Sequence, residues 1–215
     1  AWPEMVHRYA AAILVLLSFA AAVLILHQRK LAQQPVLLAT LLLMLLFWQG
    51  LLGKWTVTLR LHPLVVMSHL LGGFALLSVL WLLLLRLKPF HIPACTSQEE
   101  KLRPWAILGL LFIILQISLG GWTSANYAAF VCTDFPMCQG QWWPPMNFSA
   151  GFHLSFNAEQ NYEGGVLSTT ARTAIQMSHR LGALITTSYL ACLIYKLFGT
   201  RQGSLLRRIG LILLL

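Results

Sequence analysis

Long apolar segments recur along the whole chain, and they constrain its fold more than any other feature. Leu-rich stretches of about 18–25 residues alternate with short polar segments, and a helix of about that length crosses a bilayer core of roughly 30 Å. Only 10% of the residues are charged, compared with roughly 25% in an ordinary soluble domain. The sequence therefore predicts an all-α membrane protein and excludes a soluble globular fold.

The apolar segments predict six transmembrane helices. These cover residues 3–26, 35–53, 63–88, 104–122 and 171–198, with a sixth from about residue 205 onwards. The sixth is still apolar at Leu215, and the first begins almost at the first residue. We therefore expect a longer protein with one further transmembrane helix at each end.

The distribution of Lys and Arg predicts the orientation of these helices. The formal net charge is +9, and the basic residues cluster in segments 27–34, 86–104 and 196–208, whereas the long segment 123–170 has neither Lys nor Arg. Because basic loops remain in the cytoplasm, we expect segment 123–170 on the extracytoplasmic side of a bacterial cell membrane. Since the basic residues lie in short loops between apolar helices, nucleic-acid binding is not expected.

Three histidines fall inside the predicted helices at a similar depth. His7, His69 and His179 each lie a turn or two from the expected extracytoplasmic end of a helix. Histidine in a membrane segment is rare and usually functional, and neutral imidazole is a common ligand of haem iron. One such histidine alone would equally fit a hydrogen bond to a neighbouring helix. Three at one depth favour haem, held by a pair of facing imidazoles.

The histidines belong to an internal repeat. EMVHR at residues 4–8 resembles QMSHR at residues 176–180, and HLLGG at residues 69–73 has the spacing of HRLG at residues 179–182. The repetition indicates a duplicated unit. The predicted fold is thus a tandem pair of pseudo-repeated four-helix transmembrane bundles, with a first half at residues 1–88 and a second at residues 89–215.

Glu4 is the only acidic residue before Glu99, and it lies one helical turn before His7. A carboxylate at this depth is costly unless it is paired or functional, so two interpretations arise. Glu4 is either a proton-transfer group beside a haem, or an interface residue neutralised by Arg8 at i+4. Because the second repeat has Gln176 at this position, the first interpretation predicts one reactive site and one structural or electron-transfer site.

Two cysteines, Cys132 and Cys138, enclose the sequence TDFPM in segment 123–170. An oxidising compartment and a turn that contains proline favour a disulfide between them. The alternative is a reactive thiol pair that handles electrons or haem delivery.

In their order and spacing, these motifs resemble the haem A synthase family. The matching segments are EMVHR (4–8), TVTL (56–59) followed by HLLGG (69–73), CTDFPMC (132–138) and QMSHR (176–180). The resemblance implies an enzyme of eight transmembrane helices, of which this chain covers the second to the seventh. Its implied reaction oxidises a methyl group of haem O to the formyl group of haem A for terminal oxidase assembly.

The resemblance also implies roles for the site residues. Haem O, the substrate, is expected between His7 and His69, with Glu4 as the catalytic residue. Haem b, the cofactor, is expected on His179 and on a histidine of the last helix, which this chain lacks. The implied partners are haem O, membrane lipid, haem O synthase and oxidase assembly factors.

Two other functions compete with this interpretation. A b-type membrane cytochrome that passes electrons from quinol would use the same histidine pairs but would not need Glu4. A transporter or channel would place polar groups along a path across the membrane, whereas here they cluster towards one face.

Overall fold

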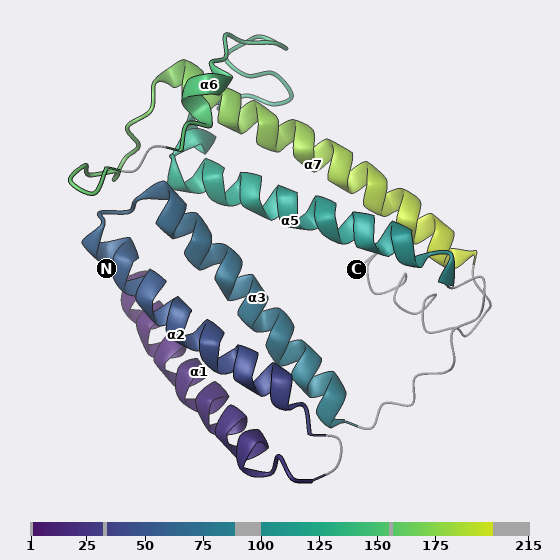
Figure 1. Cartoon of the computed structure of the whole chain (residues 1–215). Coiled ribbons are helices and arrows are strands. Elements are labelled where there is room, and N and C mark those ends of the chain that lie inside the picture. The colour runs from purple at the N-terminus through teal and green to yellow at the C-terminus, as the bar shows by residue number, and fades with distance from the viewer. Residues whose placement is uncertain (1, 32–33, 89–99, 155–156, 200–215) are drawn as a thin grey trace. The chain divides into compact units, whose positions relative to one another are not determined.

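The computed structural model describes residues 2–31, 34–88, 100–154 and 157–199. Its five long helices are α1 (Trp2–His27), α2 (Val36–Thr58), α3 (Pro63–Leu87), α5 (Arg103–Ala125) and α7 (Thr169–Phe198) (Figure 1). All five are long and apolar enough to cross a membrane, with mean hydropathies between 1.5 and 2.7. The prediction of an all-α chain with multiple membrane spans is confirmed. The predicted sixth helix, from about residue 205, lies outside the described residues.

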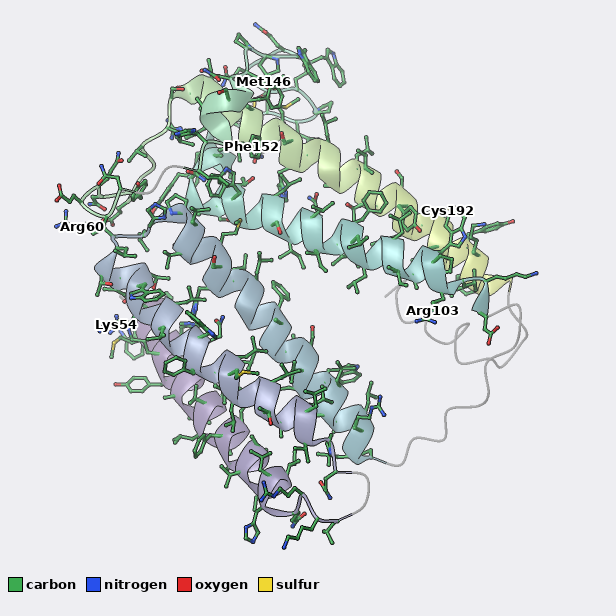
Figure 2. All side chains as sticks on the ribbon, in the orientation of Figure 1. Lys54, Arg60, Arg103, Met146, Phe152 and Cys192 are labelled. Atoms are coloured by element: carbon green, nitrogen blue, oxygen red, sulfur yellow. A yellow bond between two sulfur atoms is a disulfide. The ribbon has the colours of Figure 1, made fainter. Side chains whose placement is uncertain are left out.

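Many of the large apolar side chains of these helices are exposed, and Figure 2 draws side chains on all sides of the ribbons. Leu16, Leu37, Leu77 and Leu184 are each more than 60% exposed. In water this surface would drive aggregation, but lipid tails are as apolar as leucine. The exposed apolar surface therefore fits helices that face a bilayer.

The second helix was predicted to end at residue 53, and this end is wrong, because α2 continues to Thr58 and leaves only residues 59–62 between α2 and α3. The hydroxyl groups of Thr56 and Thr58 donate back to the carbonyls of Gly53 and Lys54, at 2.7 and 3.3 Å. These local bonds satisfy the polar side chains within the helix. Residues 54–58, predicted to lie beyond the second helix, therefore form its last part.

The described residues form two compact units. Unit 1 contains α1, α2 and α3 from Ser68 onwards, and unit 2 contains residues 60–67, α5, α7 and the segment between those two helices. That segment includes two short helices without an apolar period, η1 (Ala128–Val131) and α6 (Phe148–Gly151).

The core of unit 1 occupies only part of the length of its helices. Its buried residues are Ala22, Ile25, Ala39, Leu42, Leu46, Leu76 and Leu83. They come from the C-terminal halves of α1 and α3 and from the N-terminal half of α2. Fully buried Ala22 and Ala39 allow α1 and α2 to pack closely. The opposite ends of the three helices lie outside this core, and they carry the predicted site residues.

In unit 2, α5 and α7 pack along each other, and the segment between them folds over one end of the pair. Buried Trp122 belongs to the core there, and its Nε1 donates to the carbonyl of Gly151 at 2.9 Å. Ser168 caps α7 by accepting a hydrogen bond from the N–H of Ala171. An added Cβ on Gly151 would lie 2.8 Å from the carbonyl oxygen of Ala171, so α6 packs directly on the first turn of α7.

Candidate functional site

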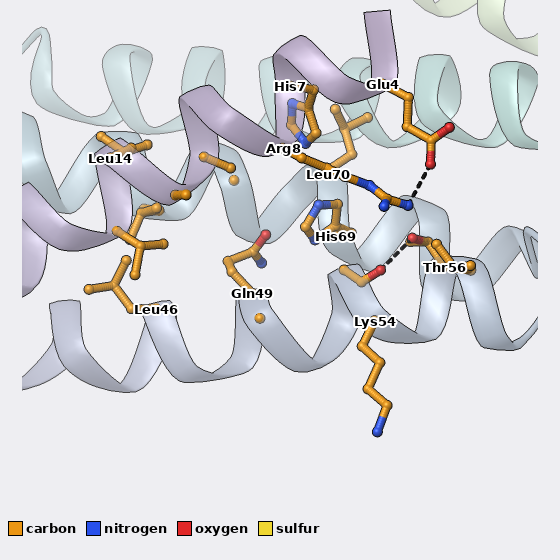
Figure 3. Close-up of a pocket in the computed structure, with 18 of the residues that line it drawn as sticks. Glu4, His7, Arg8, Leu14, Leu46, Gln49, Lys54, Thr56, His69 and Leu70 are labelled. Atoms are coloured by element: carbon orange, nitrogen blue, oxygen red, sulfur yellow. Dashed lines mark hydrogen bonds and ion pairs between the residues drawn. The ribbon is translucent and has the colours of Figure 1, made fainter. Parts of the chain in front are cut away.

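A cavity of about 990 Å³ lies in unit 1 and is lined by α1, α2 and α3. This volume is near the top of the range of about 300–1,000 Å³ for small-molecule and cofactor pockets. At the cavity's polar end, where α1 and α3 begin and α2 ends, the polar lining residues are Glu4, His7, Arg8, Lys54, Thr56, Thr58 and His69. The other end is apolar, with Leu14 and Leu46 (Figure 3). The cavity suits a large ligand with one polar edge and a long apolar part.

His7 of α1 and His69 of α3 line this cavity together (Figure 3). The ring of His69 packs over Gly53 of α2, where an added Cβ would lie 3.4 Å from Cε1. The Nδ1 atom of His69 is buried and has no hydrogen-bond partner among the described residues. The structure thus brings the two histidines to one cavity, and their role as iron ligands stays a prediction.

Glu4 also lines the cavity, and its carboxylate pairs with the guanidinium of Arg8 at 2.6 Å. The two side chains are 57% and 56% exposed, so their ion pair contributes about 0–1 kcal/mol to stability. The expected partner is therefore present, but the carboxylate is not buried within unit 1. The ion pair with Arg8 and access to the cavity therefore coexist at Glu4.

His179 lies on α7 in unit 2, and a glutamine of α5 holds its ring. Gln116 Nε2 donates to the backbone carbonyl of His179 at 3.1 Å and lies 3.0 Å from its Nδ1 atom. The ring packs over Gly120, where an added Cβ would lie 3.1 Å from Cε1. His179 is therefore held in one orientation by α5, on its Nδ1 side.

The predicted disulfide is confirmed. Cys132 and Cys138 are bonded, with their Cα atoms 4.6 Å apart. Arg180, the residue after His179, donates to the carbonyls of Met137, Cys132 and Asp134 at 2.8, 3.0 and 2.9 Å. One guanidinium therefore fixes the disulfide loop on α7 beside the histidine. Arg8, at the equivalent position of the repeat, pairs with Glu4 instead.

Asp134 holds the turn of this loop together. Its carboxylate accepts hydrogen bonds from the N–H groups of Gln139 and Gly140, both at 2.8 Å. These bonds, that of Gly140 above all, hold the pKa of Asp134 below its ordinary value. The left-handed backbone of Gly140, with φ of 72°, is a conformation that glycine adopts at little cost.

We expect Asp134→Asn to make the disulfide easier to reduce at pH 7, because the turn loses a charged acceptor. Because the pKa of Asp134 is depressed in the folded protein, its carboxylate stabilises the turn fully above the unfolded pKa of about 3.9. This stabilisation is lost as the pH falls through the folded pKa. The difference in reduction rate between the wild-type protein and Asp134→Asn should therefore shrink below about pH 4. The rate of reduction by a phosphine at pH 7 and at low pH measures this. Glu163→Gln, in the same segment, is the control, and equal rates for Asp134→Asn and wild type at pH 7 contradict the prediction.

The sequence analysis missed Gln116 and its counterpart Gln49. Both begin a segment that the chain repeats, QGLLGKWT at residues 49–56 and QISLGGWT at residues 116–123. The two segments have Gln, Leu, Gly, Trp and Thr at the same positions. This repeat relates α2 to α5, whereas the repeat that the sequence analysis used relates the helices that carry the histidines.

A second, smaller cavity of about 250 Å³ lies in unit 2 and is lined by His62, Asn126, His153 and Tyr162, among others. His62, which lies between α2 and α3, is only 1% exposed and packs edge-on against Tyr162, with ring centroids 4.7 Å apart. His62 therefore belongs to the packing of unit 2.

Comparison with known proteins gives one consistent result. The family described as COX15-CtaA, cytochrome oxidase assembly protein, matches residues 1–215. The chain is 44% identical to a haem A synthase of Shewanella oneidensis over 202 residues, which cover 94% of the chain and 60% of that protein. It is 28% identical to a haem A synthase of Neorickettsia sennetsu over 202 residues, 92% of the chain and 58% of that protein. No solved structure matched the chain.

The chain therefore spans about 60% of the length of these two curated relatives. The family match extends over all of its residues, which confirms the resemblance drawn from the histidine and cysteine motifs. On these grounds, the chain belongs to the COX15-CtaA family of cytochrome oxidase assembly proteins.

Proposed function

We propose that the protein is a haem A synthase, which oxidises a methyl group of haem O to the formyl group of haem A by successive hydroxylation and loss of water. The observation that carries this proposal is the unit 1 cavity, where Glu4, His7 and His69 lie at one polar end of an otherwise apolar volume. The 44% identity to a haem A synthase over 94% of the chain supports it.

The residues of the cavity fit haem O. Two imidazoles from facing helices are a common ligand pair for haem iron, and the buried Nδ1 of His69 has no partner among the described residues. Gly50 and Gly73 line the walls without side chains, with nothing within 4 Å of an added Cβ, which leaves room for a flat ring. The polar end suits the carboxylates of a porphyrin, and the apolar end suits an isoprenoid tail.

Each residue has a defined task in this proposal. His7 and His69 would hold the iron and so fix the plane of the ring, while bound haem b would supply redox chemistry. Glu4, one turn from His7, would accept or donate protons at its carboxylate as the methyl group is oxidised. Arg8 would keep that carboxylate oriented through the 2.6 Å ion pair, and the apolar walls would exclude bulk water.

The finer architecture is part of the proposal. Units 1 and 2 would be the two halves of a tandem pair of four-helix bundles, with haem b in the second half on His179 and a histidine outside this chain. Segment 123–170 would face the outside of a bacterial cell membrane. Its lack of Lys and Arg and its Cys132–Cys138 disulfide both support that side, because disulfides persist in oxidising compartments.

The experiment is expression in a host that makes haem O but no haem A. Mass analysis of extracted haem should show haem A only when the protein is present. If haem O persists unchanged while the purified protein carries a haem spectrum, the protein is an electron carrier and the proposal is wrong.

A further inference from the structure

The glutamine repeat lies in two helical hairpins of the same design. In α2–α3, QGLLGKWT (49–56) is followed by HLLG (69–72), and in α5–α7, QISLGGWT (116–123) is followed by HRLG (179–182). In each hairpin, the first helix has a Gln and a Gly four residues apart. The second helix has a His and a Gly three residues apart, so each pair shares a helix face.

In α5–α7 these four residues contact one another in pairs. The amide of Gln116 lies against Gly182, where an added Cβ would be 2.5 Å from Oε1. From there, Gln116 Nε2 reaches the carbonyl of His179 at 3.1 Å and its Nδ1 at 3.0 Å. On the same hairpin, the ring of His179 packs over Gly120. The absence of a side chain at Gly182 thus leaves the space in which the Gln116 amide lies while it contacts His179.

In α2–α3 the two glycine contacts recur, whereas no hydrogen bond joins Gln49 to His69 among the described residues. The amide of Gln49 occupies the space that a Cβ on Gly72 would need, and the ring of His69 packs over Gly53. Gln49 and His69 both line the unit 1 cavity, in which Figure 3 labels them. Two occurrences in separate units identify an element of the fold rather than an isolated packing detail.

The hydrogen bonds differ between the hairpins in an informative way. Gln116 occupies the Nδ1 side of His179, which leaves Nε2 for a ligand. An imidazole that binds a metal through Nε2 carries its proton on Nδ1 and needs an acceptor there. Gln116 Oε1 and His69 Nδ1 are both buried, and neither has a hydrogen-bond partner among the described residues. A half-turn of the Gln116 amide would present Oε1 to Nδ1 of His179, in exchange for the bond that Nε2 donates to the carbonyl of that residue, because an amide end offers both a donor and an acceptor.

We propose that Gln116 and Gln49 are positioning residues for the haem ligands His179 and His69. Each sits against a glycine of the neighbouring helix, and its amide oxygen accepts a hydrogen bond from the Nδ1–H group when Nε2 binds iron. Each glutamine thereby fixes the orientation and tautomer of its histidine and strengthens the imidazole as a ligand. The inference rests on the proposed function, because it takes both histidines as haem ligands.

The test uses the haem-loaded protein and compares Gln116→Leu with Gln116→Glu. The leucine variant should hold about tenfold less haem at limiting supply, because losing the hydrogen-bond partner of a ligand typically costs roughly 10–100-fold in affinity. The haem that remains should have a raised reduction potential. The glutamate variant should retain haem and have a lowered reduction potential, because a carboxylate accepts a stronger hydrogen bond from the Nδ1–H group than an amide does.

Gly182→Ala tests the space beside Gly182 without changing Gln116. Its new Cβ would lie 2.5 Å from Gln116 Oε1 and push the amide away, so the potential should rise as in Gln116→Leu. Ser118→Ala is the matched control on α5, since the Ser118 hydroxyl donates within its own helix, to the carbonyl of Ile114, and has no other partner among the described residues. Ser118→Ala should match wild type.

Two results would overturn the proposal. One is a Gln116→Leu variant with the haem content and potential of Ser118→Ala. The other is a Gln116→Glu variant that loses haem or whose potential fails to fall, because glutamate keeps both the reach and an acceptor oxygen. Failure of the proposed function looks different: the wild-type protein would then form no haem A or hold no haem at all.

Discussion

Replacing His69 by alanine is expected to abolish haem A formation and to remove haem O from unit 1, while haem b stays bound in unit 2. His69 would be one of two iron ligands in the cavity, so the loss of affinity should exceed the roughly 10–100-fold typical of losing a ligand's hydrogen-bond partner. The fold should survive, because His69 lies outside the unit 1 core. Haem content and haem type in purified protein and in cell extracts measure the effect.

His27→Ala is the matched control for this variant. His27 ends α1 and is exposed, and it lies at the opposite end of that helix from His7. This control should keep both haems and normal haem A formation. If His69→Ala also forms haem A at the wild-type rate, His69 has no part in substrate binding and the cavity loses its proposed role.

Replacing Glu4 by glutamine is expected to leave haem binding nearly intact and to slow haem A formation by about 10²–10⁴-fold, the usual contribution of a general acid or base. Glutamine keeps the size of the side chain and removes the charge. The Glu4–Arg8 pair is more than half exposed on both sides, so its loss should change stability by less than about 1 kcal/mol. The ratio of haem A to haem O in extracts, taken with the haem spectrum of the same variant, separates catalysis from binding.

Glu163→Gln serves as the control for Glu4→Gln, since it removes one carboxylate from the long segment of unit 2 and should leave the ratio unchanged. A normal ratio in Glu4→Gln would return Glu4 to the simpler interpretation, in which it is only the partner of Arg8.

Much of the fold could be predicted because the thickness of a bilayer sets the length of the apolar segments that cross it. Apolar runs of the right length identified all five long helices. The error at the end of α2 arose because Thr56 and Thr58 look like loop residues until their hydroxyls are seen to bond within the helix. The disulfide was predictable because Cys132 and Cys138 are close in sequence and lie in a segment without Lys or Arg.

The contacts around the histidines could not be predicted in this way. Arg180 reaches the carbonyls of residues 43–48 positions away, and such bonds depend on the path of the loop rather than on any periodic pattern. Gln116 lies 63 positions from His179. The sequence signal for Gln116 is the repeated segment with Gln, Leu, Gly, Trp and Thr. This repeat shows that α2 and α5 are related, but it does not show which side chains contact one another.

The central claim is that the unit 1 cavity binds haem O between His7 and His69, and an experimental structure with haem O tests it most directly. The claim predicts porphyrin density in this cavity, with iron between the two imidazoles, the ring edge near Glu4, and the tail towards Leu14 and Leu46. Density for haem O at another site, or iron bound by neither His7 nor His69, would contradict it.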